Sequence, residues 1–286
     1  METLTQPTAL GPHLERADAT NWSSLKYMGI SPLHYLHNLR NPRTDSEALL
    51  LGRLTHAMVF EPDQVAFRYI TSPRFHKGQN DSTAIGNGYD GGKQAFAAWV
   101  GSIGTKEIVE MDLMLRARAM RDAIVSDPVA GPLVTSGHSE RRIEWIDAST
   151  GILCRGRFDH LNGCLADLKT TRSLVTFERD IAKFGYHSQL AWYESGVHAA
   201  GLVTVGAPRL VAVENVPPHD VQVLTFEPDD LAVGRRVYRA ALDRLAECRR
   251  TGLWPGVSGG VARRVALPAW AGPIEEPELT MDGVPI

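Results

Sequence analysis

Two carboxylates and a lysine occur close together near the middle of the chain: Asp159, Asp167 and Lys169. In an extended strand, residues two apart point to the same side of the sheet. Asp167 and Lys169 therefore share one face, while Leu168 points to the opposite face and into the core. This spacing places an anion and a cation side by side on one strand.

The position of Asp159 relative to this face depends on the register of a hairpin. Asn162-Gly163 is a strong hairpin signal. A strict two-residue turn would place Asp159 opposite Ala166 and turn its carboxylate away from Asp167. If Gly163 instead forms a left-handed bulge in a three-residue loop, Asp159 opposes Asp167 and the two carboxylates converge. We predict the bulged form.

Converging carboxylates indicate metal-assisted hydrolysis of a phosphodiester. Two such groups repel each other unless a cation lies between them, and hard oxygen ligands suit Mg²⁺, with Mn²⁺ as a substitute. The metal would act as a Lewis acid, while Lys169 either orients and helps deprotonate a water or stabilises the charge on the phosphate. The alternative is an exposed hairpin whose Asp-Lys pair contributes roughly a few tenths of a kcal/mol.

Strands dominate the part of the chain around this hairpin. Alternating apolar residues bounded by turn residues predict five strands, at residues 140–148, 152–161, 164–171, 209–216 and 221–226. With helices before, between and after them, the predicted fold class is mixed α/β (α+β), a central mixed sheet that contains a β-meander and is flanked by helices. The predicted organisation is an N-terminal extension at 1–22, one domain at 23–256 and a Pro/Gly-rich tail at 257–286.

Helical spacing predicts the elements that cover the sheet. The expected helices lie at residues 23–40, in two pieces broken between Gly29 and Pro32, and at 46–60, 111–125, 181–200 and 229–250. The last helix is expected to begin with Asp229 or Asp230 as N-cap and to end at Gly252. Glycine-rich residues 78–92 predict an exposed loop.

The composition narrows the class of protein. The chain has 286 residues, of which 43% are hydrophobic and 22% charged, as in an ordinary globular protein. Its three cysteines form no CxxC pair, which argues against a disulfide framework, a structural zinc site or an iron-sulfur cluster. No Gly-rich phosphate loop and no G-x-S-x-G elbow is present, which argues against ATP-driven chemistry and a serine hydrolase. No signal peptide or membrane span is expected, so the predicted location is the cytoplasm.

The formal net charge of −3 is unusual for a protein that binds nucleic acid, because affinity for phosphates normally comes from clustered basic residues. Metal-binding carboxylates add to the negative count, and a basic groove can coexist with an acidic remainder. Arg141, Arg142, Arg155 and Arg157 lie beside the predicted site and either form a phosphate track or are solvated strand residues.

The ordered set of motifs resembles the PD-(D/E)xK nuclease superfamily, and within it the RecE-like exodeoxyribonuclease VIII family of phages and prophages. The matching segments are Ser24-Leu25-Lys26, Ser31-Pro32, His34-Tyr35, Leu51-Gly52, His56, Glu61-Pro62, Gly137 to Glu140, Gly151, Gly156 to Asp159, Asp167 to Thr171, Tyr186-His187, Gln189 and Tyr193. They run in the family's order from about residue 23 to 254. The resemblance implies a restriction-endonuclease-like core.

The resemblance also implies a set of metal ligands. Asp159 and Asp167 would bind the metal through their carboxylates, Leu168 through its carbonyl oxygen, and His56 through its imidazole, while Lys169 would be the catalytic lysine. From the sequence alone, a histidine on an apolar helix is more often a satisfied core residue.

Three further residues are implied to act at the site. Glu140 matches the acidic residue before the hairpin and is the favoured residue, although Glu144 competes with it because both lie on the same strand face. Gln189 and Tyr193 are four residues apart on one helix face, where the family uses them to support the lysine or contact DNA. Their alternative is a polar edge residue and a core aromatic.

The function implied is a metal-dependent exonuclease that degrades one strand of linear double-stranded DNA, in the 5′ to 3′ direction, and leaves 3′ overhangs for recombination. A homo-oligomer, a single-strand annealing protein as partner and a bacterial host cell are implied as well. An inactive DNA-binding or scaffold protein is one alternative, since Phe158 stands where the superfamily has proline. A structure-specific endonuclease is another.

Overall fold

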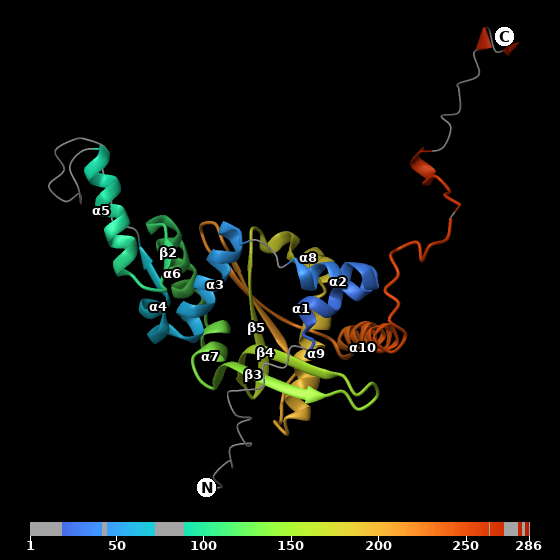
Figure 1. Ribbon diagram of the computed structural model, residues 1–286, viewed down its shortest axis with the longest axis horizontal. Coiled ribbons are helices and arrows are strands. Elements are labelled where there is room, and N and C mark those ends of the chain that lie inside the picture. Colours follow the sequence, from blue (N-terminus) through green and yellow to red (C-terminus); the bar gives the residue numbers. More distant parts are fainter. Residues whose placement is uncertain are drawn as a thin grey trace.

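Five strands form the central sheet of the computed structural model, which describes residues 19–41, 45–71, 89–262, 264–271, 280–281 and 284–285. They are β3 (His138–Ile146), β4 (Leu153–Asn162), β5 (Cys164–Thr171), β6 (Arg209–Glu214) and β7 (Val221–Thr225). The spatial order is β3-β4-β5-β6-β7; β5 and β6 run parallel, and the other neighbours are antiparallel (Figure 1). The predicted meander and mixed sheet are confirmed.

The helices and the remaining short elements lie around this sheet. The α-helices are α1 (Trp22–Leu25), α2 (Pro32–Arg40), α3 (Glu47–Phe60), α4 (Pro62–Arg68), α5 (Tyr89–Ser102), α6 (Met111–Ser126), α7 (Ala130–Val134), α8 (Phe177–Phe184), α9 (Tyr186–Ala199) and α10 (Pro228–Thr251). The short elements are η1 (Lys26–Gly29), η2 (Leu174–Thr176), η3 (Ala269–Ala271), β1 (Tyr69–Thr71), β2 (Glu107–Val109), β8 (Thr280–Met281) and β9 (Val284–Pro285). None of the described helices is long and apolar enough to cross a membrane.

Two of the predicted helices differ from the structure. The single helix expected at 181–200 is two helices, because Gly185 adopts a left-handed conformation (φ 69°) that ends α8. The last helix begins at Pro228 with Glu227 as N-cap, so the expected caps Asp229 and Asp230 lie inside the first turn, where negative charge is favourable.

The expected glycine-rich loop is described only in part. Residues 78–88 lie outside the described residues, and residues 89–92 belong to α5 rather than to a loop. The other helix predictions agree with the structure. Ser46 caps α3 through its side chain, and α10 ends at Gly252 in a left-handed conformation (φ 73°).

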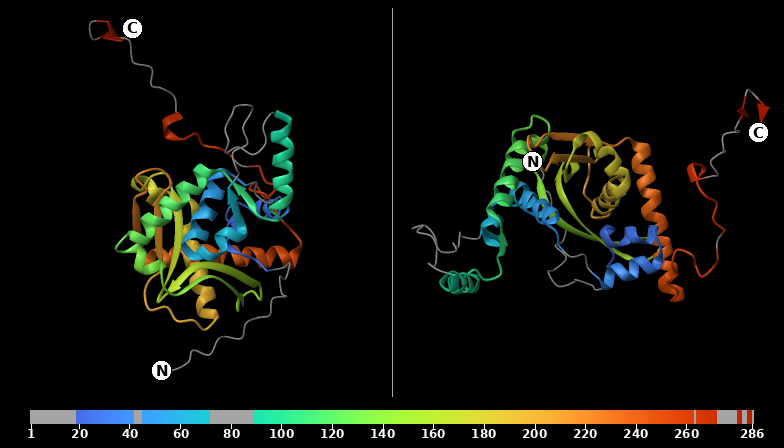
Figure 2. Two further views of the ribbon diagram at one scale, coloured as in Figure 1. Left: turned by 90° about the vertical axis from the view of Figure 1, so that its left-hand side faces the viewer. Right: turned by 90° about the horizontal axis from the view of Figure 1, so that it is seen from above.

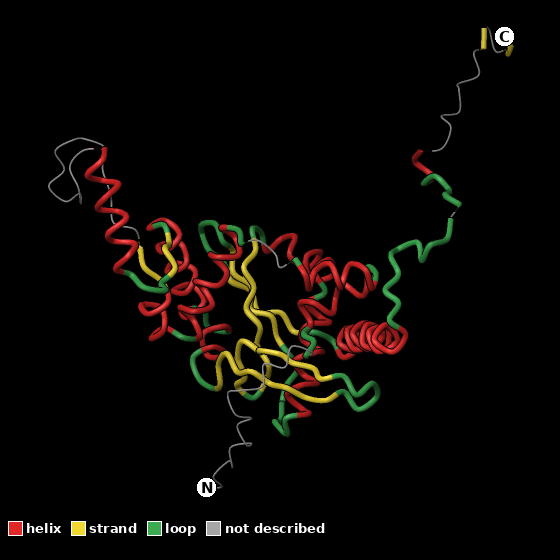
Figure 3. Tube along the Cα trace, in the orientation of Figure 1, coloured by secondary structure: helices red, strands yellow, loops and turns green. Residues whose placement is uncertain are grey.

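Helices cover both faces of the sheet (Figures 2 and 3). One face packs against α3, α6 and α7, and that core contains Leu54, Met120 and Val211. The other face packs against α1, η1, α9 and α10, and that core contains Trp192 and Leu242. A site formed between the strands is therefore enclosed from both sides.

The two halves of the meander separate where the site lies. β4 pairs with β5 only from His160 to Asn162, whereas it pairs with β3 along nearly its whole length. On the N-terminal side of His160, β4 bends away from β5, and β3 stays paired with β4 (Figure 1). The edge of β4 thus released is bridged by Thr20, whose N–H and carbonyl bond to Leu153 and Arg155 at 2.9 and 2.8 Å. The segment just before α1 therefore packs on the sheet.

Candidate metal centre

The register of the meander aligns three acidic residues across three strands. The β4–β5 ladder pairs His160 with Ala166, so extending it by one residue places Asp159 opposite Asp167. The β3–β4 ladder pairs Ser139 with His160 and Arg141 with Phe158, so the intervening residues Glu140 and Asp159 lie opposite each other. Gly163 at the tip of the hairpin has φ 67°. The predicted left-handed glycine and the predicted register are both confirmed.

Where β4 and β5 separate, the side chain of Asp159 takes the place of a backbone carbonyl as hydrogen-bond acceptor for β5. Its Oδ2 accepts a hydrogen bond of 2.8 Å from the N–H of Leu168. The carbonyl of Leu168 faces His56 on α3, with 2.9 Å between the oxygen and Nε2. The same imidazole lies 3.5 Å from Asp159 and 3.8 Å from Glu140, measured from Nδ1 to a carboxylate oxygen.

These groups fit a divalent cation. His56, Glu140 and Asp159 each offer one ligand atom, and those atoms all lie within 4.8 Å of one another. Because a carbonyl oxygen only accepts, His56 Nε2 donates the 2.9 Å hydrogen bond to Leu168, and Nδ1 is the ring nitrogen that faces Asp159 and Glu140 as a ligand atom. Burial alone would lower the pKa of His56, but the charges of Asp159 and Glu140 raise it.

Glu140 reaches this cluster through an unusual backbone conformation. Its φ of 52° lies in the left-handed region, which non-glycine residues adopt only when the surroundings hold them there. Its carboxylate forms an ion pair with Arg157, whose other nitrogen lies 3.3 Å from Glu61. Glu144, the competing residue, does not join the cluster and instead lines a pocket farther along the sheet.

Asp167 and Lys169 form a buried ion pair beside the cluster, with side chains only 2% and 16% exposed. Apart from this pair, the Asp167 carboxylate has no hydrogen-bond partner among the described residues. Burial and the nearby Asp159 raise the pKa of Asp167 to about 6, against the lowering effect of Lys169. Burial alone would lower the pKa of Lys169, but Asp167 and Asp159 raise it.

The structure also joins the two α9 residues singled out in the sequence. Gln189 Nε2 donates a hydrogen bond of 3.0 Å to the Tyr193 hydroxyl. Burial raises the pKa of Tyr193, and the charges of Asp167 and Asp159 raise it further, so the phenol stays neutral beside the cluster. A Cβ at Gly156 would lie 3.1 Å from the Tyr193 ring, so glycine here permits the close approach of α9 to β4.

A family model described as a PDDEXK-like domain of unknown function (DUF3799) matches residues 21–263, which is most of the chain. The chain belongs to this family. Among solved structures, the fold of this PDDEXK-like domain is similar to that of a Eubacterium rectale protein named only provisionally as an exonuclease. The TM-score is 0.59 and the identity 14%, over 92% of this chain and 97% of the other. At that identity the likeness shows a common fold. A comparison with curated proteins gave no match.

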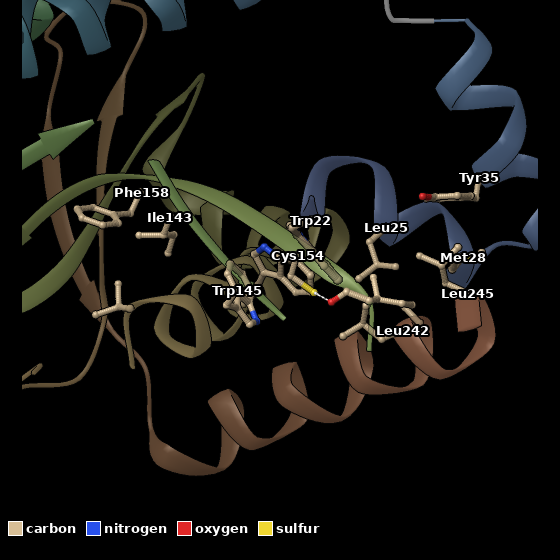
Figure 4. Close-up of a cluster of buried hydrophobic side chains, with 14 of the residues drawn as sticks. Trp22, Leu25, Met28, Tyr35, Ile143, Trp145, Cys154, Phe158, Leu242 and Leu245 are labelled. Atoms are coloured by element: carbon tan, nitrogen blue, oxygen red, sulfur yellow. Dashed lines mark hydrogen bonds between the residues drawn. The ribbon is translucent and has the colours of Figure 1, made fainter. Parts of the chain in front are cut away.

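Phe158 occupies the place of the superfamily proline in this PDDEXK-like domain. Its side chain is 1% exposed and packs in the apolar core beside Ile143 (Figure 4). It provides core packing rather than a metal ligand. Asp159, which follows it, is nevertheless held by the Leu168 N–H and placed beside His56.

Two contacts of the site were not anticipated from the sequence. The ammonium of Lys169 lies 5.0 Å from the ring centroid of Tyr186, a cation–π contact. Tyr186 precedes Tyr193 by two helical turns, and this spacing could have identified it. Phe60 lies between His56 and His160, with ring centroids 5.8 and 5.6 Å away, and no sequence signal indicated this packing.

Proposed function

We propose that this PDDEXK-like domain is a metal-dependent nuclease, and specifically an exonuclease acting on DNA ends. The observation that supports it most is the convergence of His56, Glu140, Asp159 and the Leu168 carbonyl next to the Asp167–Lys169 pair. A lone Asp-x-Lys on a hairpin is common, but a buried lysine beside a ready-made ligand cluster is the arrangement that phosphodiester hydrolysis needs.

Each residue has a definable task in this reaction. A bound Mg²⁺, for which Mn²⁺ can substitute, would supply Lewis-acid activation of the scissile phosphate. His56, Glu140, Asp159 and the Leu168 oxygen would hold it, with Asp167 as a further ligand. Lys169, kept charged by Asp167, would stabilise the negative charge that grows on the phosphate oxygens.

The direction of degradation and the partners are proposed from the motif resemblance alone. On that basis the substrate is linear double-stranded DNA, degraded from the 5′ end to leave a 3′ overhang for recombination. The same resemblance proposes a homo-oligomer and a single-strand annealing protein that receives the overhang.

The test is degradation of linear duplex DNA labelled at either the 5′ or the 3′ end, with Mg²⁺, Mn²⁺ or EDTA. The matched variants are Asp159→Asn, which removes charge but keeps an acceptor for the Leu168 N–H, and Glu144→Gln, which removes charge outside the cluster. We expect metal-dependent release of the 5′ label by the wild type and Glu144→Gln, and at least about 100-fold slower release by Asp159→Asn.

Covalently closed circular DNA distinguishes the competing functions. An exonuclease leaves it intact, whereas cleavage would replace the proposal with an endonuclease. Binding of linear DNA without loss of either label, in Mg²⁺ and in Mn²⁺, would favour the inactive DNA-binding protein. Equal rates for the wild type and Asp159→Asn would contradict the assigned metal centre.

A further inference from the structure

His160 lies next to the metal centre without being one of its ligands. It follows Asp159 on β4, and its side chain is buried, with 1% of the residue exposed. Its Nε2 lies 2.7 Å from the carbonyl oxygen of Ser136, and its Nδ1 lies 2.8 Å from the hydroxyl oxygen of Ser139. Both ring nitrogens are therefore engaged, and His160 cannot bind a metal ion while these contacts persist.

The two contacts fix the direction of each hydrogen bond. Because a carbonyl oxygen only accepts, Nε2–H donates to Ser136, and in the neutral imidazole Nδ1 accepts from the Ser139 hydroxyl. The ring thus holds both ends of the short segment that enters β3. Gly137 lies within this segment with φ 126°, and a Cβ there would clash with the carbonyl oxygen of Leu161 and lie 3.0 Å from His160 Nε2. Glycine therefore allows the segment to close over the imidazole.

Ser139 immediately precedes Glu140, the candidate ligand whose backbone is strained. The β3–β4 ladder pairs Ser139 with His160 and Arg141 with Phe158, so the register is the same on both sides of Glu140 and no residue is inserted. The φ of 52° at Glu140 is accommodated inside this continuous register. A non-glycine residue keeps such a conformation only where its surroundings hold it there. The hydrogen bond between Ser139 and His160 restrains the residue next to the strained one.

The same imidazole reaches a second candidate ligand through Phe60. The rings of His160 and Phe60 are stacked, with centroids 5.6 Å apart and planes at 18°, and Phe60 meets the ring of His56 edge-on at 5.8 Å. His56 and Phe60 are four residues apart on α3 and share one helix face. His160 therefore packs between the strand that carries Glu140 and the helix that carries His56.

We propose that His160 is a positioning residue of the metal centre, which through Ser139 holds Glu140 in the conformation that brings its carboxylate near His56. The inference rests on the proposed function, because it assigns a task at the metal site of that reaction. Removing the partner that orients a metal ligand typically weakens metal binding by about 10–100-fold. Loss of the hydrogen bond between Ser139 and His160 should therefore weaken metal binding although every ligand remains in the chain.

The test is the affinity for Mn²⁺, measured by calorimetry on the full chain. Ser139→Ala removes the hydroxyl that His160 accepts from and should weaken Mn²⁺ binding about ten-fold. Ser139→Thr keeps a hydroxyl and should bind Mn²⁺ nearly as tightly as the wild type. The matched control is Thr150→Val, which removes a hydroxyl hydrogen bond of 2.6 Å to Asp147 at the far end of the β3–β4 hairpin. It should leave Mn²⁺ affinity unchanged.

A Glu140→Gln background shows whether Ser139 acts through Glu140. Glu140→Gln should weaken Mn²⁺ binding by itself, and Ser139→Ala should cause no further loss in that background, because the carboxylate that it positions is gone. Urea unfolding of each variant verifies that it is folded and gives its stability. A purely structural role of Ser139 would lower stability and leave the Mn²⁺ affinity of the folded protein unchanged.

Three results would overturn the positioning role: unchanged Mn²⁺ affinity in folded Ser139→Ala, an equal loss in Ser139→Thr or Thr150→Val, or an equal further loss in the Glu140→Gln background. Asp159→Asn separates this inference from the metal centre itself. If Asp159→Asn weakens Mn²⁺ binding and Ser139→Ala does not, the metal centre stands and only the positioning role fails. A wild type that binds no Mn²⁺ overturns both. If Ser139→Ala weakens Mn²⁺ binding in a protein that cleaves no DNA, the nuclease function alone fails.

Discussion

At the scale of single residues, the site concentrates ionisable groups that each depend on a partner. Asp167 and Lys169 are buried together, and the nearly buried Asp159 accepts a hydrogen bond from Leu168. Removing one member of a buried ion pair leaves the other charge without compensation, which costs more than the pair contributes. Mutations at this site will therefore change stability as well as chemistry, and their effects must be measured together.

Asp159 allows the two effects to be separated. Asp159→Ala leaves the Leu168 N–H without its partner and should lower the free energy of unfolding by about 1–3 kcal/mol. Asp159→Asn keeps an acceptor oxygen and should cost clearly less, while both variants lose Mn²⁺ affinity. Urea unfolding and Mn²⁺ titration by calorimetry measure the two quantities. Equal stability of the two variants would show that the hydrogen bond to Leu168 contributes nothing.

The Asp167–Lys169 pair should behave as a unit. Lys169→Met leaves the Asp167 carboxylate buried alone and should lower the free energy of unfolding by about 3–5 kcal/mol. The double variant Asp167→Asn/Lys169→Met removes both charges and should recover a large part of that loss. A double-mutant cycle in urea gives the coupling free energy. Additive effects of the two substitutions would contradict a coupled pair.

At the scale of elements, the close packing of α9 against α10 determines where the site residues of α9 lie. α9 positions Gln189 and Tyr193 and packs against α10. A Cβ at Gly234 on α10 would lie 2.6 Å from the carbonyl oxygen of His187 on α9. The absence of a side chain at Gly234 therefore sets the distance between these helices.

Two glycine-to-alanine substitutions should change the free energy of unfolding in opposite directions. Gly234→Ala forces backbone against backbone and should lower the free energy of unfolding by about 1–3 kcal/mol. Gly52→Ala, inside α3, meets only the Thr170 hydroxyl at 3.8 Å and should raise it by up to about 1 kcal/mol through helix propensity. Thermal and urea unfolding check both. A loss at Gly52 as large as that at Gly234 would refute the packing argument.

The turn between β3 and β4 is tied to α10 by an ion pair. Asp147 bonds to both terminal nitrogens of Arg239, at 2.5 and 2.9 Å, and to Thr150. Burial alone would raise the pKa of Asp147, but Arg239 and Thr150 more than offset it and lower the pKa. The contact therefore stabilises the protein above the unfolded pKa of about 3.9, and this contribution is lost as the pH falls through the lower folded pKa.

Asp147→Asn tests this contact by its pH dependence. We expect the variant to lose about 1–3 kcal/mol of unfolding free energy at pH 7. The difference from the wild type should stay constant down to about pH 5 and shrink below about pH 4, where Asp147 becomes protonated. Urea unfolding at several pH values measures it. A stability difference between the wild type and Asp147→Asn that grows as the pH falls would contradict the lowered pKa of Asp147.

At the scale of the whole molecule, the charge of −3 hides a strong separation of charge. Three carboxylates align across the meander, and three arginines, Arg142, Arg155 and Arg157, line a pocket farther along β3 and β4. The metal-free fold must hold the acidic residues together against their repulsion, which Arg157 and Lys169 only partly offset. A cation bound between the strands would relieve that repulsion and stabilise the entire domain.

Metal should accordingly raise the unfolding temperature. A ligand that binds only the native state stabilises it by about 2.7 kcal/mol when its free concentration is about a hundred times Kd. We expect Mg²⁺ and Mn²⁺ to raise the midpoint of thermal unfolding of the wild type and of Glu144→Gln, and not of Asp159→Asn. EDTA should reverse the shift. An equal shift in Asp159→Asn would locate the bound metal elsewhere.

The sequence by itself determined the elements of the site and its central hairpin. Alternation along β5 placed Asp167 and Lys169 on one face, and Asn162-Gly163 predicted the register that aligns Asp159 with Asp167. These are local properties, because side-chain direction repeats every two residues in a strand and a glycine permits the left-handed turn. Where local signals compete, as at Gly185 within an apparently continuous helix, the prediction was wrong.

The motif resemblance proposed His56 and Glu140 for the site, but only the tertiary structure brings these distant residues together. His56 faces Leu168 across 112 residues of sequence, Glu140 rather than Glu144 enters the cluster, and Arg157 pairs with Glu140. Both glutamates satisfy the same strand periodicity, so the local pattern cannot separate them. The choice depends on where α3 packs and where β4 leaves β5, and these are set by the burial of whole helix and sheet faces.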